Sequence, residues 1–290
     1  MPETASPPPI VVGLDGQDHT RDALDWALAE AVRRRCGMHL VHGRSVPVQG
    51  PHIEPLMATS DAVAKRVLTE ATQRIRGVSG AIEVTTSTGI GSPAALLVEA
   101  SRSAQLVVVG ARGRGALASA FLGSTSLDVA AHAHCPVTVV RTLPPTSDPG
   151  EGVVVGYDTS DLSDAALGEG FRQAEQRGLP LTVVHTWTVE YADTGMVVLD
   201  PDELRSRLGD QVTTATEEAV AAWSEKYPQV RVRSRVLDAH PVSALVEASR
   251  DAALVVVGSR GLGGFRGMLL GSVSQGVLHG AHCPVMVVRP

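Results

Sequence analysis

The chain has few cysteines, few aromatic residues and no excess of positive charge, and each shortage excludes a class of protein. Three cysteines in 290 residues argue against a disulfide framework and favour a reducing compartment. Three residues each of Phe, Trp and Tyr are too few for a base-stacking platform, and a net charge of −6 argues against a nucleic-acid binder. No basic and apolar leader opens the sequence, and no apolar run approaches the roughly 18 residues of a membrane span. We therefore expect a cytoplasmic protein that contacts neither nucleic acid nor membrane.

The two halves of the chain repeat the same short motifs in the same order. The spacing inside each motif is kept, whereas the stretch between the early and late motifs differs in length. Such a repeat indicates two similar domains in tandem. The clearest pairs are IVVGLDG at Ile10–Gly16 with VVVGYDT at Val153–Thr159, LVVVGARGRG at Leu106–Gly115 with LVVVGSRGLG at Leu254–Gly263, and HCPVTVVR at His134–Arg141 with HCPVMVVR at His282–Arg289.

A segment rich in proline and polar residues separates the two halves. TLPPTSDPGE at Thr142–Glu151 has the composition of a linker. We expect a loose tail at residues 1–9, a first domain at 10–141, a linker at 142–151 and a second domain at 152–290. Each half is long enough for a hydrophobic core of its own.

Short β-branched runs alternate with longer amphipathic segments in the first half. This alternation predicts an α/β fold in which a parallel sheet carries helices on both faces. The expected strands are Ile10–Leu14, Met38–His42, Ile82–Ser87, Leu106–Val109 and Val137–Arg141, and the expected helices are Arg21–Arg34, Asp61–Arg76, one that opens at Ser92 and Pro93, and Ser124–Ala133.

The sharpest motif follows the fourth expected strand of each half. Two glycines separated by two residues are followed, after nine more residues, by a Gly-Ser pair that opens a helix: Gly110, Gly113, Gly123 and Ser124 in the first half, and Gly258, Gly261, Gly271 and Ser272 in the second. Glycines allow a close approach of the backbone to a ligand, and a helix N-terminus favours phosphate. The alternative is a surface loop whose glycines only serve tight turns. Two copies with identical spacing favour phosphate binding.

A carboxylate at the end of the first strand is the second element of the expected site. Asp15 and Asp158 hold matching positions, where a carboxylate accepts hydrogen bonds from ribose hydroxyls or loop amides. The alternative role is an N-cap for the following helix. In an open α/β sheet, ligands bind beyond the carboxyl ends of the strands where the winding reverses. We therefore expect the aspartate and the glycine loop to meet there.

These motifs resemble the ATP-binding signature of universal stress proteins, over nearly the whole chain and twice. The resemblance implies two doubly wound domains, each a five-stranded parallel sheet of order 3-2-1-4-5, two ATP sites and a regulatory role in the stress response. Mg²⁺ can accompany the phosphates.

The resemblance also implies where the parts of ATP would lie. The adenine would lie near Gly43 and Thr186, the ribose near Asp15 and Asp158, and the phosphates in the glycine loops. Gln17 departs from the small residue common in the family. The expected ATP-binding residues are Gly13, Asp15, Gly43, Gly110, Ala111, Arg112, Gly113, Gly123, Ser124, Thr125, Ser126, Gly156, Asp158, Thr186, Gly258, Ser259, Arg260, Gly261, Gly271, Ser272, Val273 and Ser274.

Several other polar residues are interpreted as structural. We expect His42 and His185 to form structural hydrogen bonds, and Cys135 and Cys283 to pack in the interior. The cluster around His134 shows no closed set of metal ligands. No catalytic residue is expected.

Three functions remain open at this point: an ATP-binding regulator, a slow ATP hydrolase or phosphotransferase using the same sites, and a nucleotide-free interaction module. The first is favoured because the glycine motif occurs twice without a recognisable base. The fifth strands, Val137–Arg141 and Val285–Arg289, are apolar until their final arginine. A bare apolar edge is normally covered, so we expect the two halves to pair through these strands, with a homodimer and a protein partner as further possibilities.

Overall fold

The computed structural model describes residues 7–44, 53–111, 122–141, 150–188, 201–263 and 269–289. The chain divides into two compact units, residues 1–144 with 289–290 and residues 145–288. Each unit is described below by itself.

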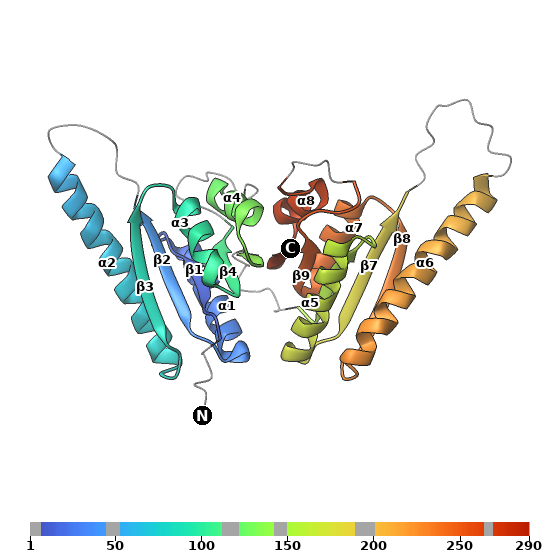
Figure 1. Ribbon diagram of the computed structural model, residues 1–290, viewed down its shortest axis with the longest axis horizontal. Coiled ribbons are helices and arrows are strands. Elements are labelled where there is room, and N and C mark those ends of the chain that lie inside the picture. The colour runs from blue at the N-terminus through green and yellow to red at the C-terminus, as the bar shows by residue number, and fades with distance from the viewer. Residues whose placement is uncertain are drawn as a thin grey trace. The chain divides into compact units, whose positions relative to one another are not determined.

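The first unit is a parallel five-stranded sheet of order β3-β2-β1-β4-β5 (Figure 1). Its strands pair in register, with Ile10 beside both Met38 and Leu106. The predicted strand order is therefore confirmed in this half. The elements are β1 (Ile10–Gly13), α1 (Asp18–Arg34), β2 (Met38–Arg44), α2 (Ile53–Val78), β3 (Val84–Ile90), α3 (Pro93–Ala100), a 3₁₀ turn (Ser101–Ser103), β4 (Leu106–Gly110), α4 (Ser124–His132) and β5 (Val137–Val140).

The second unit repeats this plan, with a parallel sheet of order β10-β9-β6-β7-β8. The central strand β6 lies between β7 and β9, as β1 lies between β2 and β4. The elements are β6 (Gly152–Tyr157), α5 (Asp161–Arg177), β7 (Leu181–Trp187), α6 (Pro201–Lys226), β8 (Val232–Asp238), α7 (Pro241–Ala248), a 3₁₀ turn (Ser249–Asp251), β9 (Ala252–Gly258), α8 (Ser272–Gly280) and β10 (Val285–Val288).

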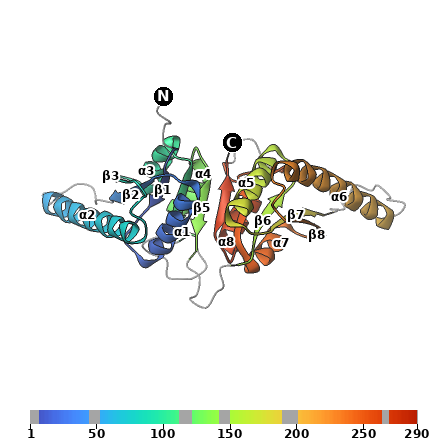
Figure 2. The ribbon, with the colours of Figure 1, turned by 90° about the horizontal axis from the view of Figure 1, so that it is seen from below.

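Helices cover both faces of each sheet. In the first unit α1 and α2 pack on one face and α3 and α4 on the other, and in the second unit α5 and α6 face α7 and α8 across the sheet (Figure 2). The central strands are buried on both sides, which explains why β4 and β9 are almost uninterrupted runs of Val and Leu. Ser92 caps α3 ahead of Pro93, as predicted.

The structure departs from the sequence-based expectations at element ends and on one helix face. The third strand begins at Val84 rather than Ile82, and α2 extends from Ile53 to Val78, well beyond the expected Asp61–Arg76. The spacing of Leu24, Ala27, Leu28, Ala31 and Val32 predicts one buried face for α1, but Val32 is 51% exposed. Its position lies at the margin of the apolar stripe, one residue past the buried Ala31. Among the described helices, none is long and apolar enough to cross a bilayer.

Candidate functional site

Asp158 stands directly after β6 and is held by hydrogen bonds on both carboxylate oxygens. Its Oδ1 accepts from the amide of Ser160 at 3.1 Å and from the Ser160 hydroxyl at 2.5 Å. Between them, Thr159 adopts a left-handed backbone with φ of +67°, which turns the chain back toward the carboxylate. Burial by itself would raise the pKa of Asp158, but the hydrogen bonds outweigh burial, and its pKa lies below the ordinary value. Asp158 is therefore an anchored anion.

The glycine loop of the second domain reaches this carboxylate. The amide of Leu262 donates to Asp158 Oδ2 at 3.0 Å, across 104 residues of sequence. Gly261 lies so close that a Cβ built on it would overlap with the same Oδ2. The structure thus brings the ends of β6 and β9 together, at the reversal of the strand order.

Helix α8 begins beside this loop. The Gly271 amide donates to the Ser259 carbonyl at 2.8 Å, and the Ser274 hydroxyl lies 3.0 Å from the same carbonyl. Gly271 is the N-cap of α8 and makes no side-chain cap, and the first amides of a helix have no acceptor within it. Ser272 is exposed at this end. These bonds join the start of α8 to the backbone just after β9.

The first domain shows the same closure where it is described. The Gly123 amide donates to the Ala111 carbonyl at 2.8 Å, and the Ser126 hydroxyl donates to the Gly110 carbonyl at 2.6 Å. Asp15 accepts from the amide of Gln17 at 2.9 Å. The predicted site residues Arg112 and Gly113 lie outside the described residues.

Two hydroxyls among the predicted ATP-binding residues already make hydrogen bonds within the protein. Ser126 and Ser274 are buried, and their hydroxyls donate to the carbonyls of Gly110, at the end of β4, and of Ser259, just after β9. A hydroxyl has a single hydrogen, so neither can also donate to a phosphate. Both hydroxyls fix the backbone before the helix against the helix itself, and their place among the ATP-binding residues stays a prediction.

Packing accounts for three further glycines of the predicted site. A Cβ on Gly13 would lie 2.8 Å from Leu97, and one on Gly156 would lie 3.0 Å from Leu245, in the equivalent helices α3 and α7. A Cβ on Gly43, at the expected adenine position, would lie 2.8 Å from Pro93 Cα. These glycines allow a short helix to approach the sheet near the site. Thr186, the matching adenine residue, is half-buried.

Both strand-end histidines make structural hydrogen bonds, as expected. His42 Nδ1 lies 2.8 Å from the Leu14 carbonyl and must be the protonated nitrogen there, because a carbonyl only accepts. His185 Nδ1 lies 2.7 Å from Thr216 Oγ1, whose hydroxyl donates to the Val212 carbonyl. Burial lowers the pKa of His185, although the charge of Asp158 opposes that shift.

The three cysteines form no disulfide and are buried. Burial raises the pKa of the Cys135 thiol to about 12, against which the Val107 amide acts weakly, so its reactive thiolate is scarce. Among the described residues, no three His, Cys, Asp or Glu side chains gather as metal ligands.

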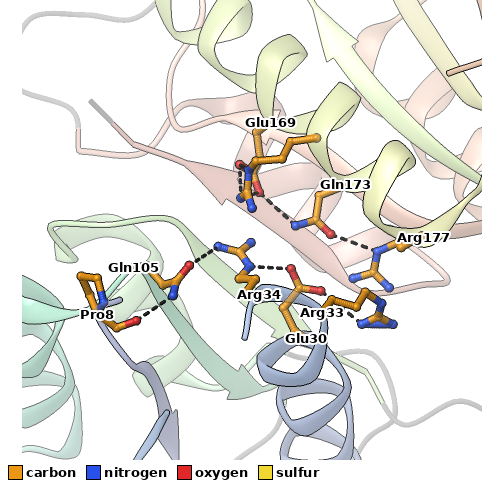
Figure 3. Close-up of polar contacts among 9 residues, drawn as sticks. Pro8, Glu30, Arg33, Arg34, Gln105, Glu169, Gln173 and Arg177 are labelled. Carbon is orange, nitrogen blue, oxygen red and sulfur yellow. Dashed lines mark hydrogen bonds and ion pairs between the residues drawn. The ribbon is translucent and has the colours of Figure 1, made fainter. Parts of the chain in front are cut away.

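Two polar networks were not predicted from the sequence, one on the helix that follows the first strand of each domain (Figure 3). On α1, the carboxylate of Glu30 is buried and bonds Arg34 at 2.7 Å, and Arg34 donates to Gln105. On α5, the Gln173 side chain bonds both Glu169 and Arg177. An i, i+4 spacing of these residues was the available signal. On α5 the network runs from the middle of the helix to its last turn, whereas Ser160, which bonds Asp158, caps the N-terminus of that helix.

The sequence predicted that Asp158 and the glycine loop would meet, but it did not identify the two donors, which are the Ser160 hydroxyl and the Leu262 amide. The Asp-x-Ser spacing was the visible signal for the first, since a Ser two residues after an Asp can reach back to it. The second has no sequence signal, because any residue but proline supplies an amide.

Comparison with known proteins identifies the family. The model of the universal stress protein family matches residues 8–141 and again residues 151–289. A universal stress protein of Mycolicibacterium smegmatis is 36% identical over 298 residues, covering all of both chains. One from Mycobacterium tuberculosis is 35% identical, covering 97% of this chain and 96% of its own. The crystal structure of a universal stress protein from Archaeoglobus fulgidus has the same fold, with a TM-score of 0.72 at 21% identity, covering 97% and 96% of the two chains. The chain therefore belongs to the universal stress protein family and carries two domains of that family in tandem.

Proposed function

We propose that this universal stress protein is a regulator that binds ATP, one molecule in each domain. The observation that carries the proposal is the hydrogen bond from the Leu262 amide to Asp158, which joins the glycine loop to the end of β6. A ribose needs hydrogen-bond acceptors and a triphosphate needs donors. This contact sets an anchored carboxylate beside the glycine loop, and Gly271 at the start of α8 bonds Ser259 of the same loop.

Charge and geometry favour a nucleotide over a free polyphosphate. The low pKa of Asp158 keeps a negative charge at one end of the site. That charge repels phosphate and attracts hydroxyl donors, so it fits the ribose end. The amides at the start of α8 and the guanidinium of Arg260 favour anions at the other end. The polarity of the site thus matches a ligand with a sugar at one end and phosphates at the other.

The protein acts here by binding rather than by turnover. His185 lies beside Asp158 and is fixed by its Nδ1 bond to Thr216, and among the described residues no three metal-ligating side chains gather. Phosphoryl transfer depends on a positioned base and metal ligands. Binding of the ligand would change the conformation of the loop that leads into α8. That change would in turn alter which partners the protein binds.

The test is mass analysis of nucleotide released from the purified, denatured protein, together with calorimetry. We expect ATP as the bound species and about two sites per chain by titration. Recovery of ADP alone would contradict the binding role in favour of hydrolysis. An absence of ATP binding in calorimetry, or a preference for inorganic triphosphate over ATP, would overturn the proposal.

A further inference from the structure

The outer strand of the second domain carries three arginines on one face. Arg231 precedes β8, and Arg233 and Arg235 lie within it, so the three recur at every second residue. All three are exposed. With a rise of about 3.3 Å per residue, the guanidinium groups are distributed over roughly 13 Å of strand. We call this set the arginine ladder.

The ladder points away from α6. His185 on β7 bonds Thr216 of α6 and therefore faces that helix, and Val236 is its partner in register. Side chains alternate along a strand, so Arg235 and Arg233 face the opposite side. The bond from Arg233 Nε to Thr182 Oγ1, at 2.9 Å, agrees with this direction.

The ladder is not neutralised within the described part of the chain. Other exposed arginines have carboxylate partners there, such as Arg250 with Glu247 and Arg205 with Asp238. Asp238 ends the same strand, but it faces α6 and is held by Arg205. Among the described residues no ion pair involves Arg231, Arg233 or Arg235. Three like charges at this spacing repel one another, and the fold leaves that repulsion without compensation.

The fold does not require the ladder, as the first domain demonstrates. Strands β3 and β8 are both seven residues long and hold the same place in their sheets. The residues of the first domain that match the ladder are Glu83, Thr85 and Ser87. Thr85 and Ser87 there bond the ring nitrogens of His39, at 2.8 and 2.9 Å. At these positions the side chains of β3 form hydrogen bonds with His39, whereas those of β8 expose positive charge to the solvent.

Among the strands that the structure describes, none pairs with the outer side of β8. β8 ends the strand order of its sheet and has β7 as its neighbour. The Leu181 amide donates to the Arg231 carbonyl, and alternate residues of a parallel strand bond to the same neighbour. The amides of Val232, Ser234 and Val236 therefore face the open edge. An open edge accepts an added strand.

We propose that the outer edge of β8 binds an extended acidic peptide segment of a partner protein, which adds a strand to the sheet. Such a segment satisfies both features at once. Its main chain pairs with the open amides, and carboxylates at alternate residues come to lie beside Arg231, Arg233 and Arg235. Paired residues of neighbouring strands share a face, and guanidinium groups bind carboxylates with two parallel bonds.

The test uses the full-length protein and a labelled peptide, Thr-Glu-Val-Glu-Val-Glu-Thr, with fluorescence anisotropy as the readout. A scrambled peptide of equal charge, with its three glutamates adjacent, is the control ligand. We expect the alternating peptide to bind at least about tenfold more tightly, because only its carboxylates match the period of the ladder. Equal binding of both peptides, or no binding of either, would overturn the proposal.

Two variants separate strand addition from general attraction of anions. Arg233→Thr with Arg235→Ser installs the residues of the first domain and should weaken binding about tenfold or more. Arg102→Ser with Arg250→Ser removes the same charge elsewhere and should leave binding unchanged. Ser234→Pro removes one outward amide and should also weaken binding, with folding checked by circular dichroism. Binding that survives Ser234→Pro in a folded variant, or tighter binding of an oligothymidylate than of the peptide, would overturn the assignment to a peptide strand.

Discussion

At the scale of single residues, the ionisation of Asp158 should have a measurable effect on the stability of the folded protein. Its folded pKa is below the ordinary value, so the folded state binds a proton less readily than the unfolded state does. The stabilisation is therefore present above the unfolded pKa, about 3.9, and is lost as the pH falls through the folded pKa. Asp158→Asn should flatten the acid limb of a plot of urea midpoint against pH. An acid limb as steep as in the parent would contradict this account of the carboxylate.

The same carboxylate should matter for the ligand. Asp158→Ala should weaken ATP binding in the second domain by about 1.5–3 kcal/mol, roughly 10- to 150-fold, if Asp158 accepts ribose hydrogen bonds. The measurement is calorimetry on two chains that both carry Asp15→Ala, one with Asp158 and one with Asp158→Ala. The first site is then weakened in both chains, and the difference between them reports on the second site. Unchanged affinity for ATP would leave Asp158 only its role in holding the loop.

Gly261 and Gly263 form a matched pair in one loop. A Cβ on Gly261 would overlap with Asp158, whereas a Cβ on Gly263 would meet no atom within 4 Å. We expect Gly261→Ala to displace the loop and to reduce ATP binding in the second domain, and Gly263→Ala to leave it unchanged. Equal titrations for the two variants would show that the loop tolerates a side chain at either position.

The Cys135 thiol should resist chemical modification. With its pKa raised to about 12 by burial, little thiolate is present at pH 8. A thiol-specific dye should label the folded protein slowly and the urea-unfolded protein fast. Rapid labelling of Cys135 in the folded state would contradict its placement in the interior.

At the scale of elements, glycines set how closely α5 approaches its neighbours. A Cβ on Gly170 would overlap with Val155 of β6, and one on Gly168 would overlap with Trp223 of α6. Trp223 continues a stack with Phe171 and Tyr227, whose ring centroids lie 5.8 to 6.5 Å apart. In the second domain α5 and α6 therefore pack through stacked aromatic rings, and the absence of a side chain at Gly168 leaves room for Trp223.

One substitution should therefore have opposite effects in two helices. Gly170→Ala should destabilise the protein by about 1–3 kcal/mol, because overpacking against Val155 exceeds the gain in helix propensity. Gly77→Ala in α2 meets open space and should stabilise by about 0.5 kcal/mol. Urea unfolding of the two variants compares them directly. A stabilised Gly170→Ala would show that α5 can shift away from the sheet at little cost.

At the scale of the whole molecule, the pairing of the halves through their fifth strands stays a prediction from the sequence. Val139 and Val287 are at the centre of β5 and β10 and are 1% and 0% exposed. Val139→Glu with Val287→Glu should cost several kcal/mol, loosen the chain in solution scattering and expose the linker to protease. A double variant as compact and resistant as the parent would show that these strands are not the junction.

The sequence by itself determined the repeat, the alternation of strands and helices, and the positions of the aspartate and the glycine loop. These features are local, since they depend on the order and spacing of residues along one stretch of chain. The sequence did not predict the exact ends of β3 and α2 or the exposure of Val32, because packing overrides periodicity at the margins of an element.

Only the tertiary structure decided which donors meet Asp158 and which hydroxyls are already engaged. The Leu262 amide lies 104 residues away in sequence, and every residue but proline has such a donor. Ser126 and Ser274 carry the right chemistry for phosphate, yet burial against the loop carbonyls uses their single hydrogen. The arginine ladder also became visible as a surface only once β8 was known to end its sheet. Sequence specifies which groups are present, whereas the fold decides which of them remain available.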